Sequence, residues 1–361
     1  MFLIENWGKS KERLEALWEK EIIDRCCISV EVSEPNLAEI PSELFNNKLD
    51  LVKYYTDAEY ILERHRKKFE NTYYGGDAFP CIFPYLGTGG HIAYLKNVSM
   101  EFAKDTIWFH ETIKDWESNL LEYDPESPTF KKQIEIIKYL VAKSSGEYFV
   151  SMPDNCGSVD GLSQLRGTDN LMIDFIEEPE KVKKATSIIS KVLSSTSDTL
   201  FNILKENNLG GSVHSWMQTW CPVRHMQLQC DTSVMVSPKI FEEFYLPELE
   251  EATKWLDRSI YHLDGEEQIR HLDMILSIKN LDMIQWTPVA GQPPTFDFIP
   301  VLQKIQRAGK GLVLIPNPEE VEKLMSALSP KGLQLVVKGV KTKEDARTLV
   351  KKVEYWSQPH K

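Results

Sequence analysis

The sequence predicts a parallel α/β fold in one domain, and within that class a closed (β/α)8 TIM barrel. Short apolar runs with strand character alternate with helical patterns about eight or nine times along the chain, as expected for parallel strands joined by crossover helices. Eight such units favour a closed barrel over an open doubly wound sheet. No G-x-G-x-x-G follows the first strand, which disfavours a dinucleotide-binding sheet.

The first half of the chain begins with a predicted helix over residues 1–24, because Leu14, Leu17, Trp18 and Ile22 share one helical face. We expect residues 1–75 to form an N-terminal helical extension of a single barrel domain spanning 1–361. The elements expected next are a strand over 26–32, a helix over 49–71, a strand over 78–85, a tight loop over 86–90, a helix start within 91–95, a loop region with short helices over 101–125, a helix over 128–145 and a strand over 148–153.

The second half continues the alternation of short apolar strands with amphipathic helices. The expected elements are a Gly-rich turn and helix over 154–171, a helix over 179–207, strands over 212–218 and 225–231, a helix over 238–256, a strand over 259–264 with a helix over 266–276, a strand over 281–286, a helix over 298–308, a strand over 311–315, a helix over 318–328, a strand over 333–337 and a last helix over 343–355.

Composition and charge exclude several classes of protein. The 361 residues are 42% hydrophobic and carry a net charge of −12, so nucleic acid and anionic membrane surfaces are disfavoured partners. No apolar run has the length of a signal-peptide core or a membrane span. The six cysteines form no C-x-x-C pair or disulfide framework, which indicates free thiols and a cytoplasmic location.

The strand end Ile260-Tyr261-His262-Leu263-Asp264-Gly265 carries the main candidate site. Side chains alternate along a strand, so His262 and Asp264 project to the same side. A histidine beside an acid at a strand end is typical of a functional site. The alternative is a structural His–Asp pair, or Asp264 as the N-cap of the following helix.

Polar residues gather where barrel enzymes place their functional groups, at the carboxyl ends of strands. Alternation also turns polar side chains of two predicted strands toward the barrel interior, which is normally filled with Val, Ile and Leu. We interpret this as a polar ligand cavity, against a hydrogen-bonded structural network as the alternative. The residues concerned are Asp154, Asp160 and Arg166 after the 148–153 strand, Ser212, His214, Trp216 and Gln218, and His225, Gln227, Gln229 and Asp231.

Two cysteines and one loop complete the candidate list. Cys230 points outward by the same alternation, whereas Cys221 lies in a loop, where it is either inert or a nucleophile or metal ligand. The proline-rich loop after the 281–286 strand should be rigid. It offers Trp286 as a stacking wall and Gln292 as an amide contact, or it is simply a well-packed turn.

Three stretches resemble the uroporphyrinogen decarboxylase superfamily, which includes corrinoid-linked methyltransferases. Residues 160–175 are similar to the segment before the family's long helix. Residues 231–247 resemble its "SP-x-x-F-E-E-F-x-x-P" helix, the most specific of the three. Residues 261–265 take the place of its His-containing strand end. The resemblance covers most of the chain after about residue 78 and implies a (β/α)8 barrel.

Departures from this superfamily narrow the expected reaction. The decarboxylase resemblance implies an Arg-rich N-terminal loop that grips carboxylates, but this chain offers only Arg25 there, so uroporphyrinogen is a poor substrate. The thiol-directed methyltransferases imply zinc held by His-x-Cys and a later Cys. Here the first motif is His262-Leu263-Asp264 and the later position, over 337–340, has no cysteine. An alternative is a site with nitrogen and oxygen ligands in place of sulfur, in which His262 and Asp264 bind a divalent metal such as zinc.

The resemblance therefore implies a methyltransferase that moves a methyl group from a small methylated ether or amine to a corrinoid carried by a partner protein. His262 would act as an acid held by Asp264, or both would hold a metal. Asp231 or Asp154 would position the substrate, and Trp216 and Trp286 would wall it. The alternatives are a decarboxylase or lyase of a small or porphyrin-type acid, and a non-catalytic ligand-binding barrel. A homodimer is left open.

Overall fold

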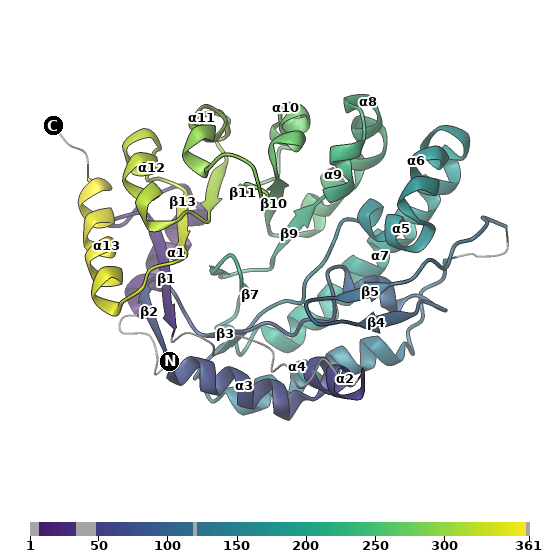
Figure 1. Ribbon diagram of the computed structural model, residues 1–361, viewed down its shortest axis with the longest axis horizontal. Coiled ribbons are helices and arrows are strands. Elements are labelled where there is room, and N and C mark those ends of the chain that lie inside the picture. Colours follow the sequence, from purple (N-terminus) through teal and green to yellow (C-terminus); the bar gives the residue numbers. More distant parts are fainter. Residues whose placement is uncertain (1–6, 34–47, 118–120, 359–361) are drawn as a thin grey trace.

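The computed structural model describes residues 7–33, 48–117 and 121–358, and its centre is a largely parallel sheet. This sheet has seven strands in the order β2-β1-β13-β12-β11-β10-β9. Every neighbouring pair is parallel except β2 with β1. Helices form an outer layer around the strands (Figure 1). The predicted parallel α/β class is confirmed.

The strands agree with the expected positions for most of the sheet. Those in the sheet are β1 (Cys27–Ser33), β2 (Thr72–Gly76), β9 (His225–Gln229), β10 (Arg258–Asp264), β11 (Met283–Thr287), β12 (Gly311–Leu314) and β13 (Leu333–Val337). The strands outside it are β3 (Cys81–Ile82), β4 (Met100–Phe102), β5 (Ile107–Phe109), β6 (Phe149–Val150), β7 (Ser212–His214) and β8 (Thr219–Cys221).

The main helices follow the predicted order. They are α1 (Trp7–Trp18), α2 (Lys48–Thr56), α3 (Ala58–Glu70), α4 (Pro128–Ser144), α5 (Ser158–Arg166), α6 (Thr168–Glu177), α7 (Pro179–Leu204), α8 (Pro238–Ile240), α9 (Leu246–Trp255), α10 (Leu272–Ser277), α11 (Ile299–Arg307), α12 (Val321–Ala327) and α13 (Lys343–Trp356). A π-helical turn, η4 (Phe241–Tyr245), joins α8 to α9. The 3-10 turns are η2 (Gly90–Tyr94), η3 (Asp231–Met235), η5 (Glu266–His271), η6 (Thr295–Phe298) and η7 (Pro318–Glu320).

Several boundaries differ from the sequence-based expectation. The single helix expected over 49–71 is two helices, because Asp57 caps the start of α3 by accepting from the Tyr60 backbone N–H. Gly167, at φ +82°, breaks the helix expected over 154–171. Short helices were expected over 101–125, but residues 100–109 form the antiparallel β4–β5 hairpin. The segment 1–75, expected as a helical extension, also contributes β1 and β2 to the sheet.

The strand ladders of the described residues do not close the predicted eight-stranded barrel. Outside the main sheet, β3 pairs with β6, β7 with β8, and β4 with β5. Strands β3 and β6 have two residues each, too few to extend a ladder to both neighbours. Isolated bonds cross the gaps instead. The Met152 N–H donates to the Val213 carbonyl at 3.0 Å, and the Gln218 side chain accepts from the Phe79 N–H at 2.9 Å.

The space inside the strands has an apolar layer at one end and a polar layer at the other. Along β10, Ile260 belongs to a buried cluster that includes Leu17 and Trp18 of α1, and the inward positions that follow are His262 and Asp264. Helix α1 therefore covers the amino ends of the strands, where the Trp18 indole N–H donates to the Trp220 carbonyl at 3.0 Å. The polar end lies at the carboxyl ends, where barrel-like folds carry their sites.

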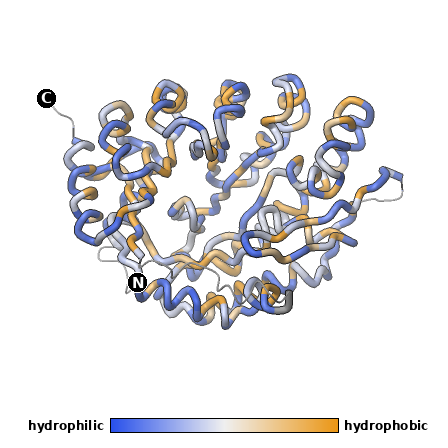
Figure 2. Tube along the Cα trace, in the orientation of Figure 1, coloured by the Kyte–Doolittle hydropathy of each residue, from blue (hydrophilic) through white to orange (hydrophobic). Residues whose placement is uncertain are grey.

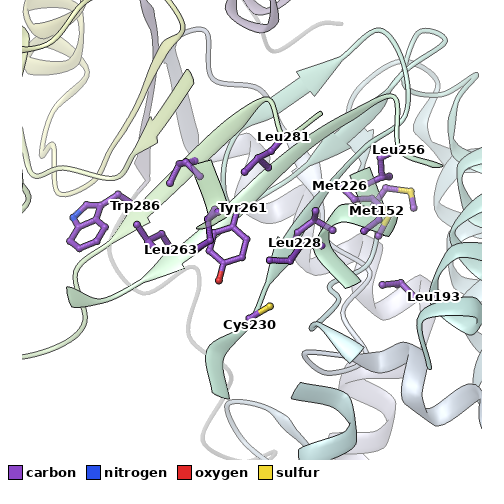
Figure 3. Close-up of a cluster of buried hydrophobic side chains, with 14 of the residues drawn as sticks. Met152, Leu193, Met226, Leu228, Cys230, Leu256, Tyr261, Leu263, Leu281 and Trp286 are labelled. Atoms are coloured by element: carbon purple, nitrogen blue, oxygen red, sulfur yellow. The ribbon is translucent and has the colours of Figure 1, made fainter. Parts of the chain in front are cut away.

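The larger hydrophobic core lies between the strands and the outer helices. Alternate residues of β9, β10 and β11 point into it, among them Leu228, Tyr261, Leu263 and Trp286, as Figure 3 shows. Apolar stretches alternate with hydrophilic ones along the outer helices (Figure 2). Because the outward-facing side chains of the strands are packed in this core, it determines which side chains face inward. No helix of the described residues has the length and apolar character needed to cross a bilayer.

A buried carboxylate ties the N-terminal segment to the sheet. Asp77, with no exposed surface, accepts from both terminal nitrogens of Arg25, at 2.5 and 3.0 Å, and from Arg13 at 3.1 Å. It also accepts from the Ile28 backbone N–H at 3.0 Å. Each charge in this group therefore has a partner, as buried charges require.

Candidate functional site

Three ionisable side chains meet at the carboxyl ends of β9 and β10. Asp231 begins η3, two residues beyond the end of β9 at Gln229, and His262 and Asp264 lie at the end of β10. One ligand atom from each residue lies within 4.8 Å of the others. The His262 Nε2 to Asp264 Oδ1 distance is 3.8 Å, and these side chains are 14% and 30% exposed. The group, here called the Asp–His–Asp cluster, is therefore accessible from outside the protein.

Strand alternation explains how the sequence builds this cluster. In the β9–β10 register His262 stands beside Gln229, so the inward sides of both strands align. Tyr261 and Leu263, the neighbours of His262, are fully buried in the outer core. Gly265, at φ +82°, ends the strand, and a Cβ there would lie 3.1 Å from the Gln292 side chain. The prediction that His262 and Asp264 share one side is confirmed.

His262 has polar contacts on one ring nitrogen and an aromatic contact at its ring. Its Nδ1 is hydrogen-bonded to Gln285 Oε1, and the Trp216 ring meets it edge to face at 5.5 Å between centroids. Burial lowers the pKa of His262, opposed by Gln285 and by the Asp264 carboxylate. The imidazole is therefore neutral at pH 7.

Asp231 is held as a neutral acid. Burial, together with the neighbouring Asp160, Asp264 and Asp154, raises its pKa to about 8. Its Oδ2 accepts from Gln229 Nε2 at 2.7 Å. Its Oδ1 is buried and has no hydrogen-bond partner among the described residues. An unpartnered buried oxygen on a residue of the cluster indicates a position that a proton, a metal or a ligand would complete.

Asp160 positions Asp231 without joining the cluster. Its carboxylate accepts from the backbone N–H groups of Asp231 and Thr232, both at 2.8 Å, and from the Thr232 hydroxyl at 2.6 Å. These bonds fix the first turn of η3. Burial raises the pKa of Asp160. Glu248 accepts from the Ser158 N–H, and burial raises its pKa to about 7.

Asp154 lies at the edge of the cluster, where its charge acts on Asp231. It accepts from the Thr88 hydroxyl at 3.2 Å, and burial raises its pKa to about 6. No lysine or arginine forms an ion pair with Asp154, Asp231 or Asp264 within the described ranges. The candidate site is therefore electronegative.

His214 and Gln227 extend the polar surface inward. Burial lowers the pKa of His214 to about 3, opposed by the adjacent Gln227, and its ring lies 5.1 Å from Trp216. Both ring nitrogens of His214 and the Gln227 Oε1 are buried without hydrogen-bond partners in the described part of the chain. Gln227 donates to Gln229, which in turn donates to Asp231. Of the predicted residues, the structure gathers Asp154, His214, Trp216, Gln227 and Gln229 around the cluster.

Four predicted site residues lie elsewhere or make structural contacts. Trp286 points away from the interior and packs on Phe298 at 4.7 Å between ring centroids. The Gln218 amide bonds to the backbone of Phe79 and Ser215, in a turn and not on the strand expected there. Gln292 bonds to Glu267 and to two backbone N–H groups of nearby loops.

Arg166 is the fourth of these predicted site residues, and its guanidinium already binds other groups of the protein. Its Nε donates to Asp174 Oδ2 at 2.7 Å, and its Nη1 donates to the carbonyls of Ile113 and Lys114. We expect Arg166→Met to lower the free energy of unfolding by roughly 3 kcal/mol, because the buried Asp174 carboxylate loses its charged partner. Substrate affinity should stay unchanged. Denaturant unfolding and a KM measurement test this, and a raised KM with unchanged stability would contradict it.

Cysteine chemistry is not part of this site. Cys230 points into the outer core as predicted. Cys221 is fully buried in the inner apolar cluster, and desolvation raises its pKa to about 12. A protonated, enclosed thiol is neither a nucleophile nor a metal ligand.

Sequence reasoning missed Gln285, which contacts His262, and Phe83, whose ring lies 6.3 Å from His214. The sequence pattern could have identified Gln285, because it shares the inward side of β11 with Met283 and Thr287. Phe83 follows the short strand β3 in an irregular segment, so no periodicity marks it.

Comparisons with known proteins agree with the fold. No family model and no curated protein sequence matches the chain. A solved structure of a methyltransferase from Methanosarcina mazei superposes with a TM-score of 0.57 at 14% sequence identity. The match covers 97% of this chain and 99% of that one. The likeness thus extends over nearly the full length of both chains and shows that they share a fold.

Proposed function

We propose that the protein is a methyltransferase component that moves a methyl group from a small methylated ether or amine to a corrinoid carried by a partner protein. The observation that carries the proposal is the accessible Asp–His–Asp cluster at the carboxyl ends of β9 and β10. The shared fold with a methyltransferase over nearly all of both chains supports it. The resemblance of residues 231–247 and 261–265 to the uroporphyrinogen decarboxylase superfamily supports a corrinoid as the methyl acceptor.

The residues of the cluster fit a divalent metal such as zinc. They offer one imidazole nitrogen and two carboxylates, and catalytic zinc commonly has three protein ligands with an open position. The unpartnered Oδ1 of Asp231 and the Nε2 of His262 are the atoms that would bind it. A metal bound there would act as a Lewis acid toward the oxygen or nitrogen that loses its methyl group.

The chain's own residues suit the same step. Where no metal is bound, a departing oxygen or nitrogen needs a proton, and Asp231, with a pKa of about 8, carries one at neutral pH. The neutral His262 lacks the second proton of an imidazolium, so Asp231 is the better acid. The half-buried Trp216 offers an apolar wall beside the cluster.

Access for a partner protein is available on the neighbouring loops. Met235 in η3 and Val289 in the loop after β11 are 51% and 36% exposed. Both follow strands of the sheet at their carboxyl ends, so a partner protein docked over this end would cover them. The porphyrin-acid alternative loses support, because Arg25 is buried against Asp77 and cannot grip a substrate carboxylate.

A direct test is methyl transfer to chemically reduced cobalamin from a panel of methoxylated compounds and methylated amines. We expect methylcobalamin to form with at least one donor class, and metal analysis to find a divalent metal that a chelator removes together with activity. Turnover of a small carboxylic acid without any corrinoid would instead establish a lyase. Tight ligand binding without turnover would establish a binding protein.

Metal affinity should fall as the pH falls below about 8. Asp231 must lose its proton to bind a metal, and its pKa is about 8. Below that value the proton competes, so the apparent affinity for Zn2+ should fall up to tenfold per pH unit. Burial lowers the pKa of His262, so its proton competes less than that of Asp231. Competition with a chromophoric chelator between pH 6 and 9 measures this, and a flat profile would contradict it.

A further inference from the structure

Gln285 contacts Nδ1 of His262, the one ring nitrogen that is hydrogen-bonded among the described residues. It is fully buried on β11, and the β10–β11 register sets it directly beside His262. Its Nε2 donates to the Trp286 carbonyl at 2.8 Å and to the Thr287 hydroxyl at 2.6 Å. Both amide hydrogens are therefore in use, and only Oε1 faces His262 Nδ1.

The reverse orientation of the amide is excluded by its neighbours. A rotated amide would bring Oε1 to the Trp286 carbonyl, which is an acceptor only. The amide oxygen must therefore face the imidazole. Because an oxygen of this kind only accepts, Nδ1 has to carry the hydrogen.

We propose that Gln285 is a positioning residue that fixes His262 in the Nδ1–H tautomer, which leaves Nε2 as a bare lone pair facing Asp231 and Asp264. The tautomer follows from hydrogen bonds alone. Its use, as a metal ligand or proton acceptor, rests on the function proposed above. It also reverses the expectation that His262 is the acid, because a neutral ring in this tautomer has no hydrogen on Nε2.

The groups around the ring are compatible with this assignment. Asp264 Oδ1 on β10 lies 3.8 Å from Nε2, and Asp231 in η3 belongs to the same cluster. The Asp160 carboxylate acts on the ring from α5. Neutral His214 and the Trp216 ring complete the surroundings. Orienting a ligating histidine through its other nitrogen is a common device in metal sites.

The test is 15N NMR of the imidazole nitrogens in metal-free protein, with His262 assigned by its absence in His262→Ala. We expect the wild type to show a protonated Nδ1 and a bare Nε2. Gln285→Met should lose this tautomer and bind Zn2+ about 10- to 100-fold more weakly.

Gln334→Met is the matched control. Gln334 is also fully buried, on β13, but its amide donates to the carbonyls of Met217 and Gln218, away from the cluster. This variant should lose stability yet keep the tautomer and the Zn2+ affinity. A protonated Nε2 in the wild type, or an unchanged tautomer in Gln285→Met, would overturn the proposal. A wild type with the expected tautomer that binds no Zn2+ would uphold it and contradict only the metal.

Discussion

Replacing His262 by alanine is expected to reduce methyl transfer to reduced cobalamin by roughly 10²- to 10⁴-fold. The variant loses the Nε2 that would bind a metal or accept a proton, and loss of a positioned proton acceptor spans this range. The variant loses the only nitrogen of the Asp–His–Asp cluster and leaves Asp231 and Asp264 facing each other. Their repulsion should raise the pKa of Asp231 further. Methylcobalamin formation under single-turnover conditions measures the loss.

His110→Ala provides the matched control for this variant. His110 follows β5 and is exposed, with Glu101 as its partner at 3.5 Å. It should transfer methyl groups at the wild-type rate. Full activity in His262→Ala, with folding verified by denaturant unfolding, would remove the cluster from the reaction and with it the proposed function.

The site was predictable wherever a strand is regular. Along β9 the alternation correctly separated Gln227 and Gln229 from Met226 and Leu228, because each side meets a different environment. The same logic placed His262 and Asp264 together. The approach of Asp231 to this pair depends on the β9–β10 register and on η3. The sequence indicated only that Asp231 and the His262–Asp264 pair each lie at the end of a strand.

Predictions failed where a strand boundary was misplaced by one or two residues. Trp286 was placed where the strand expected over 281–286 gives way to the loop. Because β11 continues to Thr287, the pleat sends Trp286 outward and Gln285 inward. Trp216 and Gln218 were placed on a strand that ends at His214. Trp216 reaches His262 through a turn, which no periodicity could reveal.

Barrel closure was not predictable for a related reason. Strand count suggested eight units, but closure depends on strand length, and β3, β6 and β7 have two, two and three residues. Side chains replace the missing ladders: Gln334 Nε2 donates to the carbonyls of Met217 and Gln218 at 3.0 and 2.6 Å. A glutamine in an apolar strand pattern gives no sign of this role.

Asp77→Asn is expected to destabilise the fold by about 3–5 kcal/mol, the cost of removing one partner from a buried ion pair. The amide cannot neutralise Arg25, which is 3% exposed, and its NH2 group would face arginine donors. The Ile28 N–H would also lose a charged acceptor. The loss should appear as a lower midpoint in urea unfolding.

Asp24→Asn separates this effect from the general loss of an acid near Arg13. Asp24 binds the same arginine through two hydrogen bonds, at 2.7 and 2.6 Å, but its side chain is 32% exposed. Solvent should limit its cost to about 1 kcal/mol or less. Equal unfolding midpoints for the two variants would mean that Asp77 does not hold β1 and α1 to the sheet. Because α1 covers the apolar end of the interior, a large loss in Asp77→Asn alone would show that anchoring α1 and β1 at this end stabilises the fold.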